Sequence, residues 1–175
     1  MRSRKDFFEG GTIPWLMSGE VAQGEVNSAT NFITPLAVAN SSAKLFPPDT
    51  VLVAMYGATA GQVGILRFEA TTNQAVCGIY PNAKFLPEFL FYVFLHKKAE
   101  LVAQATGGAQ PNISQEKIRD THVPMPSIEQ QRKLVKQLSS LKEQSATLET
   151  IYQQKQSDLA GLKKAVLGAA FRGEL

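Results

Sequence analysis

The feature that most constrains this sequence is a seven-residue repeat near its C-terminal end. Leucine or alanine recurs at every seventh position from Leu134 to Ala169, with Lys155 as the one polar member of the series. A second series begins four residues after the first, at Leu138, and ends at Val166. Positions a and d of a helical coiled coil have this spacing, so the repeat predicts a coiled coil of roughly five heptads.

The large apolar side chains of the repeat are the expected contact face, called the seam below. A helix of about 40 residues is a rod on the order of 60 Å long. Such a rod outruns a domain of roughly 125 residues, which is about 30 Å across, so a helix lying across its own domain is the less favoured alternative. The repeat therefore predicts a homodimer through this helix. The predicted dimerisation residues are Leu134, Leu138, Leu141, Leu148, Tyr152, Leu159, Leu162 and Val166.

The residues at the start of the long helix mark a boundary in the chain. The Ser127 hydroxyl can accept a hydrogen bond from a free backbone N–H, and Gln130 three residues later completes a capping box. Glu129 lies in the first turn, where the helix dipole favours a negative charge. The sequence therefore predicts a globular domain over residues 1–126, followed by a long helix over residues 127–175.

The region before the helix mixes short strands with helices, which predicts an α+β domain with a small mixed sheet. Short β-branched and apolar runs predict the strands, and Gly57 to Gly61 supply the turn of a hairpin. A longer apolar run, which covers most of a helix circumference, predicts a buried helix. The expected strands span 49–57, 61–69, 73–81 and 121–126, and the expected helices span 87–105 and a short segment from about Ser114.

Composition limits the class of protein. The chain of 175 residues has one cysteine, Cys77, so it can form no internal disulfide. It has no apolar run of about 18 residues that would span a membrane, and its first residues are charged rather than apolar. Residues 1–127 hold ten basic and ten acidic side chains, whereas residues 128–175 hold eight and five. We expect a cytoplasmic protein without a membrane segment, and a nucleic-acid partner is permitted but not required.

The sequence offers no pattern typical of a catalytic centre. The glycine-rich run "YGATAGQVG" lacks the lysine of a phosphate-binding loop, because Gly64 is followed by Ile65. One cysteine and two distant histidines, His96 and His122, supply no metal-ligand cluster. We therefore expect no catalytic residue, metal or cofactor, and interpret the chain as a binding protein.

Polar side chains in the predicted loops are the candidates for that binding. Asparagine and glutamine can read adenine with two hydrogen bonds, and lysine and arginine contact guanine or phosphate. Each such residue, taken alone, is more often a solvated turn residue. The candidate DNA-binding residues are Lys44, Gln62, Arg67, Thr72, Asn73, Gln74, Gln110 and Asn112.

Five stretches of the sequence, taken together and in this order, carry a family resemblance. The stretches are "GGTIPWLMSGEV" (10–21), "LFPPDTVLVAMYGATAGQVGIL" (45–66), "TNQAVCGIYPN" (72–82) with "LPEFLFYVFL" (86–95), "PMPSIEQQRKLVKQL" (124–138) and "LKKAVLGAAFRGEL" (162–175). With them the chain resembles a specificity subunit of a type I restriction–modification system, with one target-recognition domain and one spacer helix. The resemblance covers nearly the whole chain, and the proline–Glu-Gln helix entry with the Ala-Phe-x-Gly-Glu-Leu ending is its most specific part.

The resemblance implies a non-catalytic subunit that reads one half of a bipartite DNA target in the major groove. The helix would set the spacing between two recognition domains and dock DNA methyltransferase subunits, and through them an ATP-driven restriction subunit. Members of the family carry two such domains and two helices, so the chain is either a half-subunit that dimerises or a fragment. The alternative is a truncated coiled-coil subunit with a structural or regulatory role, which binds the methyltransferase without reading DNA.

Overall fold

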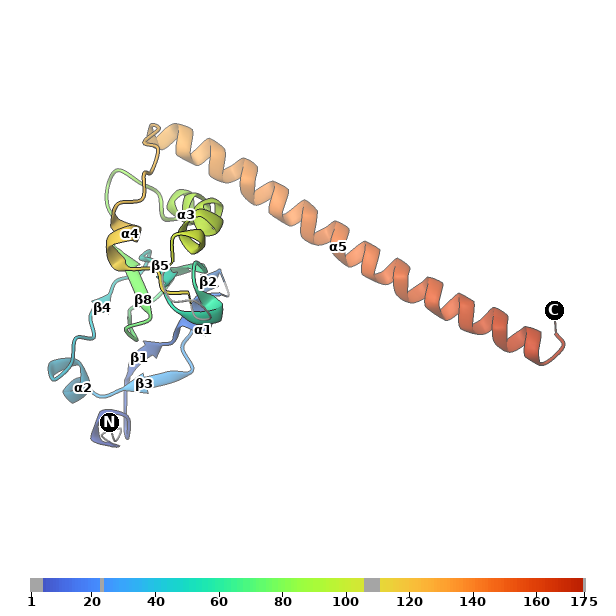
Figure 1. Cartoon of the computed structure of the whole chain (residues 1–175), viewed down its shortest axis with the longest axis horizontal. Helices are drawn as coiled ribbons and strands as arrows, with labels where there is room; N and C mark the ends of the chain where they lie inside the picture. Colours follow the sequence, from blue (N-terminus) through green and yellow to red (C-terminus); the bar gives the residue numbers. More distant parts are fainter. Residues whose placement is uncertain (1–4, 23, 106–110, 175) are drawn as a thin grey trace. The chain divides into compact units, whose positions relative to one another are not determined.

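The computed structural model describes residues 5–22, 24–105 and 111–174. The chain divides into two units, Met1–Arg132 and Lys133–Leu175. Figure 1 labels most of the elements, and all but the last helix lie in the first unit. The long helix α5 (Ile128–Phe171) begins in the first unit and makes up nearly all of the second.

The first unit contains two four-stranded sheets of mixed direction. In the first sheet, β1 runs parallel to β7, and the two outer strands are antiparallel to their neighbours. This arrangement brings together strands that are far apart in the sequence. In spatial order the strands are β3 (Asn31–Ile33), β1 (Ile13–Leu16), β7 (Ala70–Thr72) and β4 (Leu45–Phe46).

The second sheet confirms three of the predicted strands. β5 pairs antiparallel with both β6 and β8, and β2 is parallel to β6. Gly57 and Gly61, with φ of 67° and 77°, adopt the left-handed conformation that the predicted β5–β6 turn requires. In spatial order the strands are β2 (Glu25–Val26), β6 (Val63–Leu66), β5 (Val51–Ala54) and β8 (Val76–Ile79).

β5 is buried on both of its faces, which explains its continuous apolar sequence. Val51 and Val53 belong to the core cluster that also contains residues of α3 (Pro87–Ala103). Their neighbours Leu52 and Ala54 point to the opposite face, where they join a second cluster with residues of the first sheet. The second sheet therefore forms the centre of the first unit.

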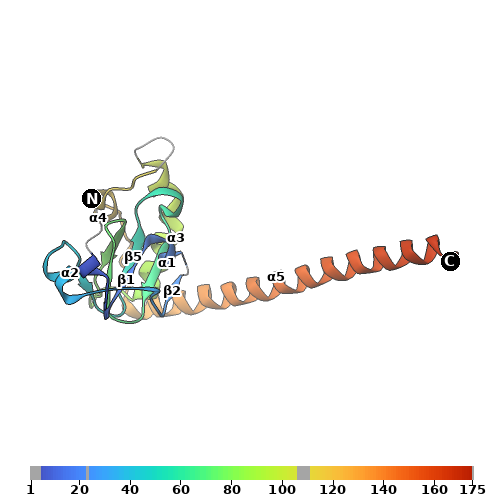
Figure 2. The same ribbon diagram turned by 90° about the horizontal axis from the view of Figure 1, so that it is seen from below.

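The predicted helix over 87–105 is confirmed as α3, with Pro87 in its first turn. It packs on β5 and β6, beside which it lies in Figures 1 and 2. The prediction that its whole apolar circumference is buried is wrong at Leu95, whose side chain is 43% exposed. The helix covers one face of the sheet and keeps an outer side in contact with solvent. Its buried residues are Phe89, Leu90, Phe91, Phe94 and Leu101.

The predicted short helix is confirmed as α4 (Gln115–Arg119). The Ser114 hydroxyl oxygen accepts a hydrogen bond from the Lys117 backbone N–H at 3.3 Å, as expected of a helix cap. The predicted strand over 121–126 is wrong, because this segment joins no sheet. Pro124 and Pro126 lack the N–H that a ladder would need. The other short helices are η1 (Lys5–Phe7), α1 (Ser18–Val21), α2 (Pro35–Ala39) and η2 (Gly57–Thr59).

The first turn of α5 is attached to the first unit by a buried glutamine. The predicted capping box is confirmed, since the Ser127 backbone N–H donates to Gln130 Oε1 at 2.9 Å and the Gln130 N–H donates to Ser127 Oγ at 3.3 Å. Gln131 is fully buried, and its Oε1 accepts from the Leu86 backbone N–H at 2.9 Å. Its amide nitrogen donates to the carbonyl oxygens of Lys84, at 2.9 Å, and Pro126, at 3.0 Å. The compact unit therefore continues past residue 126.

The second unit has no core of its own. Gln131 is the buried residue of α5, so none of the described helix residues beyond Arg132 is buried. All eight seam residues are exposed, from 37% at Leu138 to 65% at Leu159. The α+β class with a long C-terminal helix is confirmed. The coiled coil between chains stays a prediction.

Candidate nucleic-acid interface

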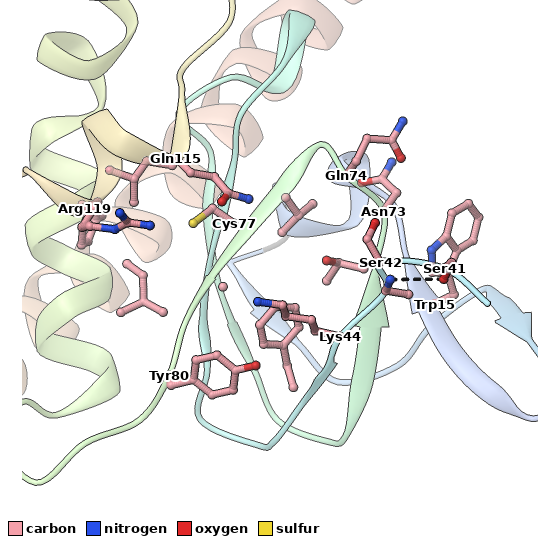
Figure 3. A pocket seen from close by; sticks show the side chains of 18 of the residues that line it. Trp15, Ser41, Ser42, Lys44, Asn73, Gln74, Cys77, Tyr80, Gln115 and Arg119 are labelled. Atoms are coloured by element: carbon pink, nitrogen blue, oxygen red, sulfur yellow. Dashed lines mark hydrogen bonds between the residues drawn. The ribbon is translucent and has the colours of Figure 1, made fainter. Parts of the chain in front are cut away.

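A cleft of about 830 Å³ opens in the first unit. Its walls come from segments that are distant in sequence: the residues before β4, the connection from β7 to β8, β8 itself and α4. Figure 3 shows side chains from these segments around the cleft. The fold thus joins polar residues that the sequence scatters over nearly half of its length.

The floor of the cleft is a close contact between the two sheets. The ring of Phe46, from β4, lies so close to Gly78 of β8 that a Cβ atom there would be 2.4 Å from a ring carbon. Phe46 also packs against Tyr80, with ring centroids 5.3 Å apart. A residue larger than glycine at position 78 would require the Phe46 ring to move, so Gly78 allows β4 and β8 to pack closely.

Four of the predicted DNA-binding residues line this cleft: Lys44, Thr72, Asn73 and Gln74. Lys44 and Gln74 are exposed, whereas Thr72 is buried in the wall. Asn73 has a local structural role, because its Oδ1 accepts a hydrogen bond from the Ala75 backbone N–H at 3.1 Å. That contact is an Asx turn that leads the chain into β8.

Two residues of α4 also line the cleft and were missed by the sequence interpretation. Gln115 and Arg119 are both exposed, and they lie four positions apart, which places them on one face of the helix. In Figure 3 both side chains point from α4 toward Cys77. The Ser114 cap is the sequence feature that could have identified them. It indicates that a helix begins there, and residues four positions apart in a helix share a face.

Cys77 lies half-buried in the wall formed by β8. Burial raises the pKa of its thiol, and the positive charge of Arg119 lowers it by a smaller amount, so that the pKa stays above its ordinary value. The electrostatic effect of Arg119 indicates that its guanidinium group lies near the thiol. The pKa of the Cys77 thiol therefore depends on the charge beside it in the cleft.

Two other predicted residues, Gln62 and Asn112, lie outside the cleft lining. Gln62 is in the turn before β6, where its backbone N–H donates to the Thr59 carbonyl oxygen at 2.9 Å. Asn112 forms an isolated backbone bridge with Tyr56. Gln110, the last candidate next to them in sequence, lies outside the described residues. The structure does not bring Gln62 and Asn112 together with the cleft residues.

Arg67 is surrounded by three carboxylates, in what we call the Arg67 cluster. Its guanidinium group lies 2.7 Å from Asp49 Oδ1, 2.7 Å from Glu88 Oε1 and 2.9 Å from Glu25 Oε1. Burial lowers the pKa of Arg67, but the hydrogen bonds to the three acids outweigh that effect and raise it. Asp49 adopts a left-handed conformation, with φ of 66°. The cluster joins β2, the start of β5, the end of β6 and α3, so Arg67 has a structural role.

No group of three or more His, Cys, Asp or Glu side chains in the described part of the chain could hold a metal ion. No described helix is both long enough and apolar enough to cross a membrane.

The chain matches the type I restriction modification DNA specificity domain over residues 1–156. It is 25% identical over 139 residues to the type I restriction enzyme EcoR124I/EcoR124II specificity subunit of Escherichia coli, covering 77% of this chain and 34% of the relative. It is 32% identical over 135 residues to the type I restriction enzyme MjaIX specificity subunit of Methanocaldococcus jannaschii, covering 74% of this chain and 31% of that relative. The chain spans about a third of the length of these curated relatives.

Solved structures share the fold. A chain from a type I R-M system has a TM-score of 0.77 at 21% identity, with 100% of this chain and 42% of that chain covered. The HsdS subunit from Thermoanaerobacter tengcongensis has a TM-score of 0.70 at 21% identity, with 100% and 41% covered. With the match to the family over residues 1–156, the chain belongs to the type I restriction–modification DNA specificity domains.

Proposed function

We propose that this chain is the DNA-recognition part of a type I restriction–modification complex, and that it reads one half of a bipartite target through the cleft. The observation that carries the proposal is the composition of the cleft: a lysine, an arginine and several amide side chains converge there, in a domain of the DNA specificity family. These are the side chains that contact phosphates and base edges in protein–DNA interfaces. The chain itself would catalyse no reaction, and its partners would carry out the chemistry in the cytoplasm.

Within the cleft, we assign base reading to the amides of Asn73 and Gln74. Both side chains line the cleft where the chain enters β8, and Figure 3 shows them close to each other. The NH₂ of an amide side chain can donate to adenine N7 while its carbonyl oxygen accepts from the adenine N6 amino group. Gln62, Gln110 and Asn112 remain candidates for a wider interface, and the pairing of Arg67 with three carboxylates disfavours it as a DNA contact.

We assign spacing and assembly to the helical part, with residues 1–126 as the recognition domain and 127–175 as the spacer. The exposed seam supports this assignment, because a stripe of leucines in water favours a partner helix. The partner helix would come from a second copy of the chain, and the resulting dimer would present two identical recognition domains. Its target would then be a split palindrome. The same part would dock the methyltransferase and, through it, a restriction subunit.

The first test is a tagged pull-down from the native host, with mass spectrometry of the co-purifying proteins. A DNA methyltransferase in stoichiometric amount is the expected result. Recovery of the protein alone, as a dimer, would favour the regulatory alternative and would contradict the proposed complex.

A second test compares two glutamines, one inside the cleft and one outside. In the complex with the methyltransferase, Gln74→Ala is expected to relax selection at one position of the half-site, by about 1–3 kcal/mol of discrimination. Gln104→Ala, a matched control at an exposed glutamine outside the cleft lining, is expected to leave selection unchanged. Binding of both variants to a library of randomised half-sites measures the difference. Equal effects of the two substitutions would contradict the assignment of base reading to the cleft.

A third test addresses the seam. Leu148→Asp places a charge among the leucines of the seam, and we expect it to convert the dimer to a monomer. Ala146→Asp, on the outer side of the same repeat, is the control and should leave the dimer intact. Light scattering on both variants gives the mass in solution. A monomeric unsubstituted protein, or an unchanged mass for Leu148→Asp, would refute the coiled-coil assignment.

A further inference from the structure

We propose that Lys44 and Arg119 together bind one sugar–phosphate strand of the DNA within the cleft, an inference that rests on the proposed function. The two residues are the cationic side chains among the described residues that line the cleft. They come from different elements, since Lys44 precedes β4 and Arg119 lies on α4, and both are exposed. Figure 3 shows both side chains at the cleft, with Cys77 of β8 in the same wall.

The charge of the cleft favours an anion. None of its described lining residues is an aspartate or a glutamate, although the chain has 15 acidic residues. Within the described part of the chain, neither Lys44 nor Arg119 has an ion-pair partner. Arg67 is the opposite case, because three carboxylates surround its guanidinium group. The two cleft cations therefore keep their full attraction for a negative ligand.

The neighbouring charge on α4 distinguishes Arg119 further. Lys117, two residues before Arg119, donates from its ammonium group to the Gln104 backbone carbonyl oxygen. Arg119 instead lies near the thiol of Cys77, whose pKa it lowers against the larger effect of burial. Figure 3 shows the Arg119 side chain at the wall of the cleft, and the five N–H donors of its guanidinium group are available for phosphate oxygens.

The size of the cleft limits which part of a DNA molecule can enter it. A volume of about 830 Å³ is that of a small-ligand site, and a duplex whose major groove alone is about 12 Å wide does not fit inside. A single sugar–phosphate strand is the convex, anionic ridge of the duplex. Half or more of the hydrogen bonds in protein–DNA interfaces go to phosphate and sugar. The pair would therefore position the duplex, while Asn73 and Gln74 contact base edges.

The test measures the salt dependence of binding by the full chain in complex with its methyltransferase. Lys44→Met and Arg119→Met each remove one charge and keep an apolar stem. Each is expected to reduce the slope of log affinity against log salt by about 0.9. Between 50 and 200 mM salt, the variant would therefore lose roughly threefold less affinity than the unsubstituted complex. Selection among randomised half-sites should stay unchanged, because phosphate contacts carry no sequence information directly. Lys98→Met, on α3 and outside the cleft lining, is the matched control.

The outcomes separate this inference from the proposed function. Reduced slopes for both cleft variants, with an unchanged slope for Lys98→Met, support the phosphate contact. An altered base preference at one half-site position would overturn it, because the substituted residue would then read a base. Unchanged slopes would also overturn it, because the sugar–phosphate strand would then bind elsewhere. An unsubstituted complex without any sequence preference would instead refute the proposed function.

Discussion

The two units of this molecule use leucine in opposite ways. Leu52, at the centre of β5, is fully buried between two sheets, whereas Leu148, in the middle of α5, is 54% exposed. The first unit buries apolar side chains on both faces of its second sheet. The second unit is one helix whose described residues are all at least partly in contact with solvent. The difference teaches that the first unit is stabilised by contacts within the chain, whereas the leucines of the helix make no such buried contacts and stay exposed.

The largest expected effect is a loss of stability that distinguishes Leu52 from Leu148. Leu52→Ala should lower the free energy of unfolding of the first unit by about 2–5 kcal/mol, because it leaves a cavity in a packed core. Leu148→Ala should leave the unfolding of the first unit unchanged. Urea denaturation followed by the fluorescence of Trp15, the only tryptophan of the sequence, reports on the first unit. Similar losses for both variants would show that the units do not differ in this way.

The next prediction concerns the buried attachment of the first helical turn. Gln131→Leu leaves the Leu86 N–H and the carbonyl oxygens of Lys84 and Pro126 without their partner. Leaving such buried groups unpaired costs about 1–3 kcal/mol, so the free energy of unfolding of the first unit should fall by this amount. Gln137→Leu, at an exposed position of the same helix, is the control and should change it by less than about 0.5 kcal/mol. Chemical denaturation of the two variants measures the free energy of unfolding of the first unit. Equal losses in the two variants would contradict a special role for Gln131.

A smaller effect is expected at the Arg67 cluster. Arg67→Met leaves three carboxylates without their cation, but these acids are partly exposed, so the loss in stability should be about 1 kcal/mol. High salt should reduce the difference between the variant and the unsubstituted protein, since salt screens exposed charges. Thermal unfolding at low and high ionic strength measures this. DNA selection by the complex should not change, and a loss of selection with unchanged stability would assign Arg67 to the DNA contact instead.

The smallest expected effect is a change in the reactivity of Cys77. Because burial raises the pKa of its thiol, the pH at which half of the maximal alkylation rate is reached should be higher in the folded protein than in the urea-unfolded chain. The charge of Arg119 lowers this pKa, so Arg119→Met should move the midpoint to a still higher pH. Mass spectrometry of the alkylated protein over a pH series gives both midpoints. A midpoint unaffected by the substitution would show that Arg119 does not lie near the thiol.

Local signals predicted much of the fold. The apolar runs of β5, β6 and β8, the glycine turn between the first two, and the caps at Ser114 and Ser127 all depend on residues close together in sequence. The prediction failed at residues 121–126, where an extended pattern resembled a strand but two prolines removed the donors of a ladder. The prediction also did not include Gln115 and Arg119 among the candidate DNA-binding residues, although they line the same cleft as the candidates before β8.

The sequence by itself determined the strands β5, β6 and β8 and the helices α3, α4 and α5, and it predicts a partner helix, because periodicity and helix caps are properties of neighbouring residues. Only the tertiary structure decided which polar residues meet. It packed Phe46 of β4 against Gly78 of β8, and thereby placed Lys44 and Arg119 at one cleft. It also paired Arg67 with three acids from distant segments. Contacts of this kind depend on how the two sheets and α4 pack in space, and no local pattern in the sequence encodes that packing.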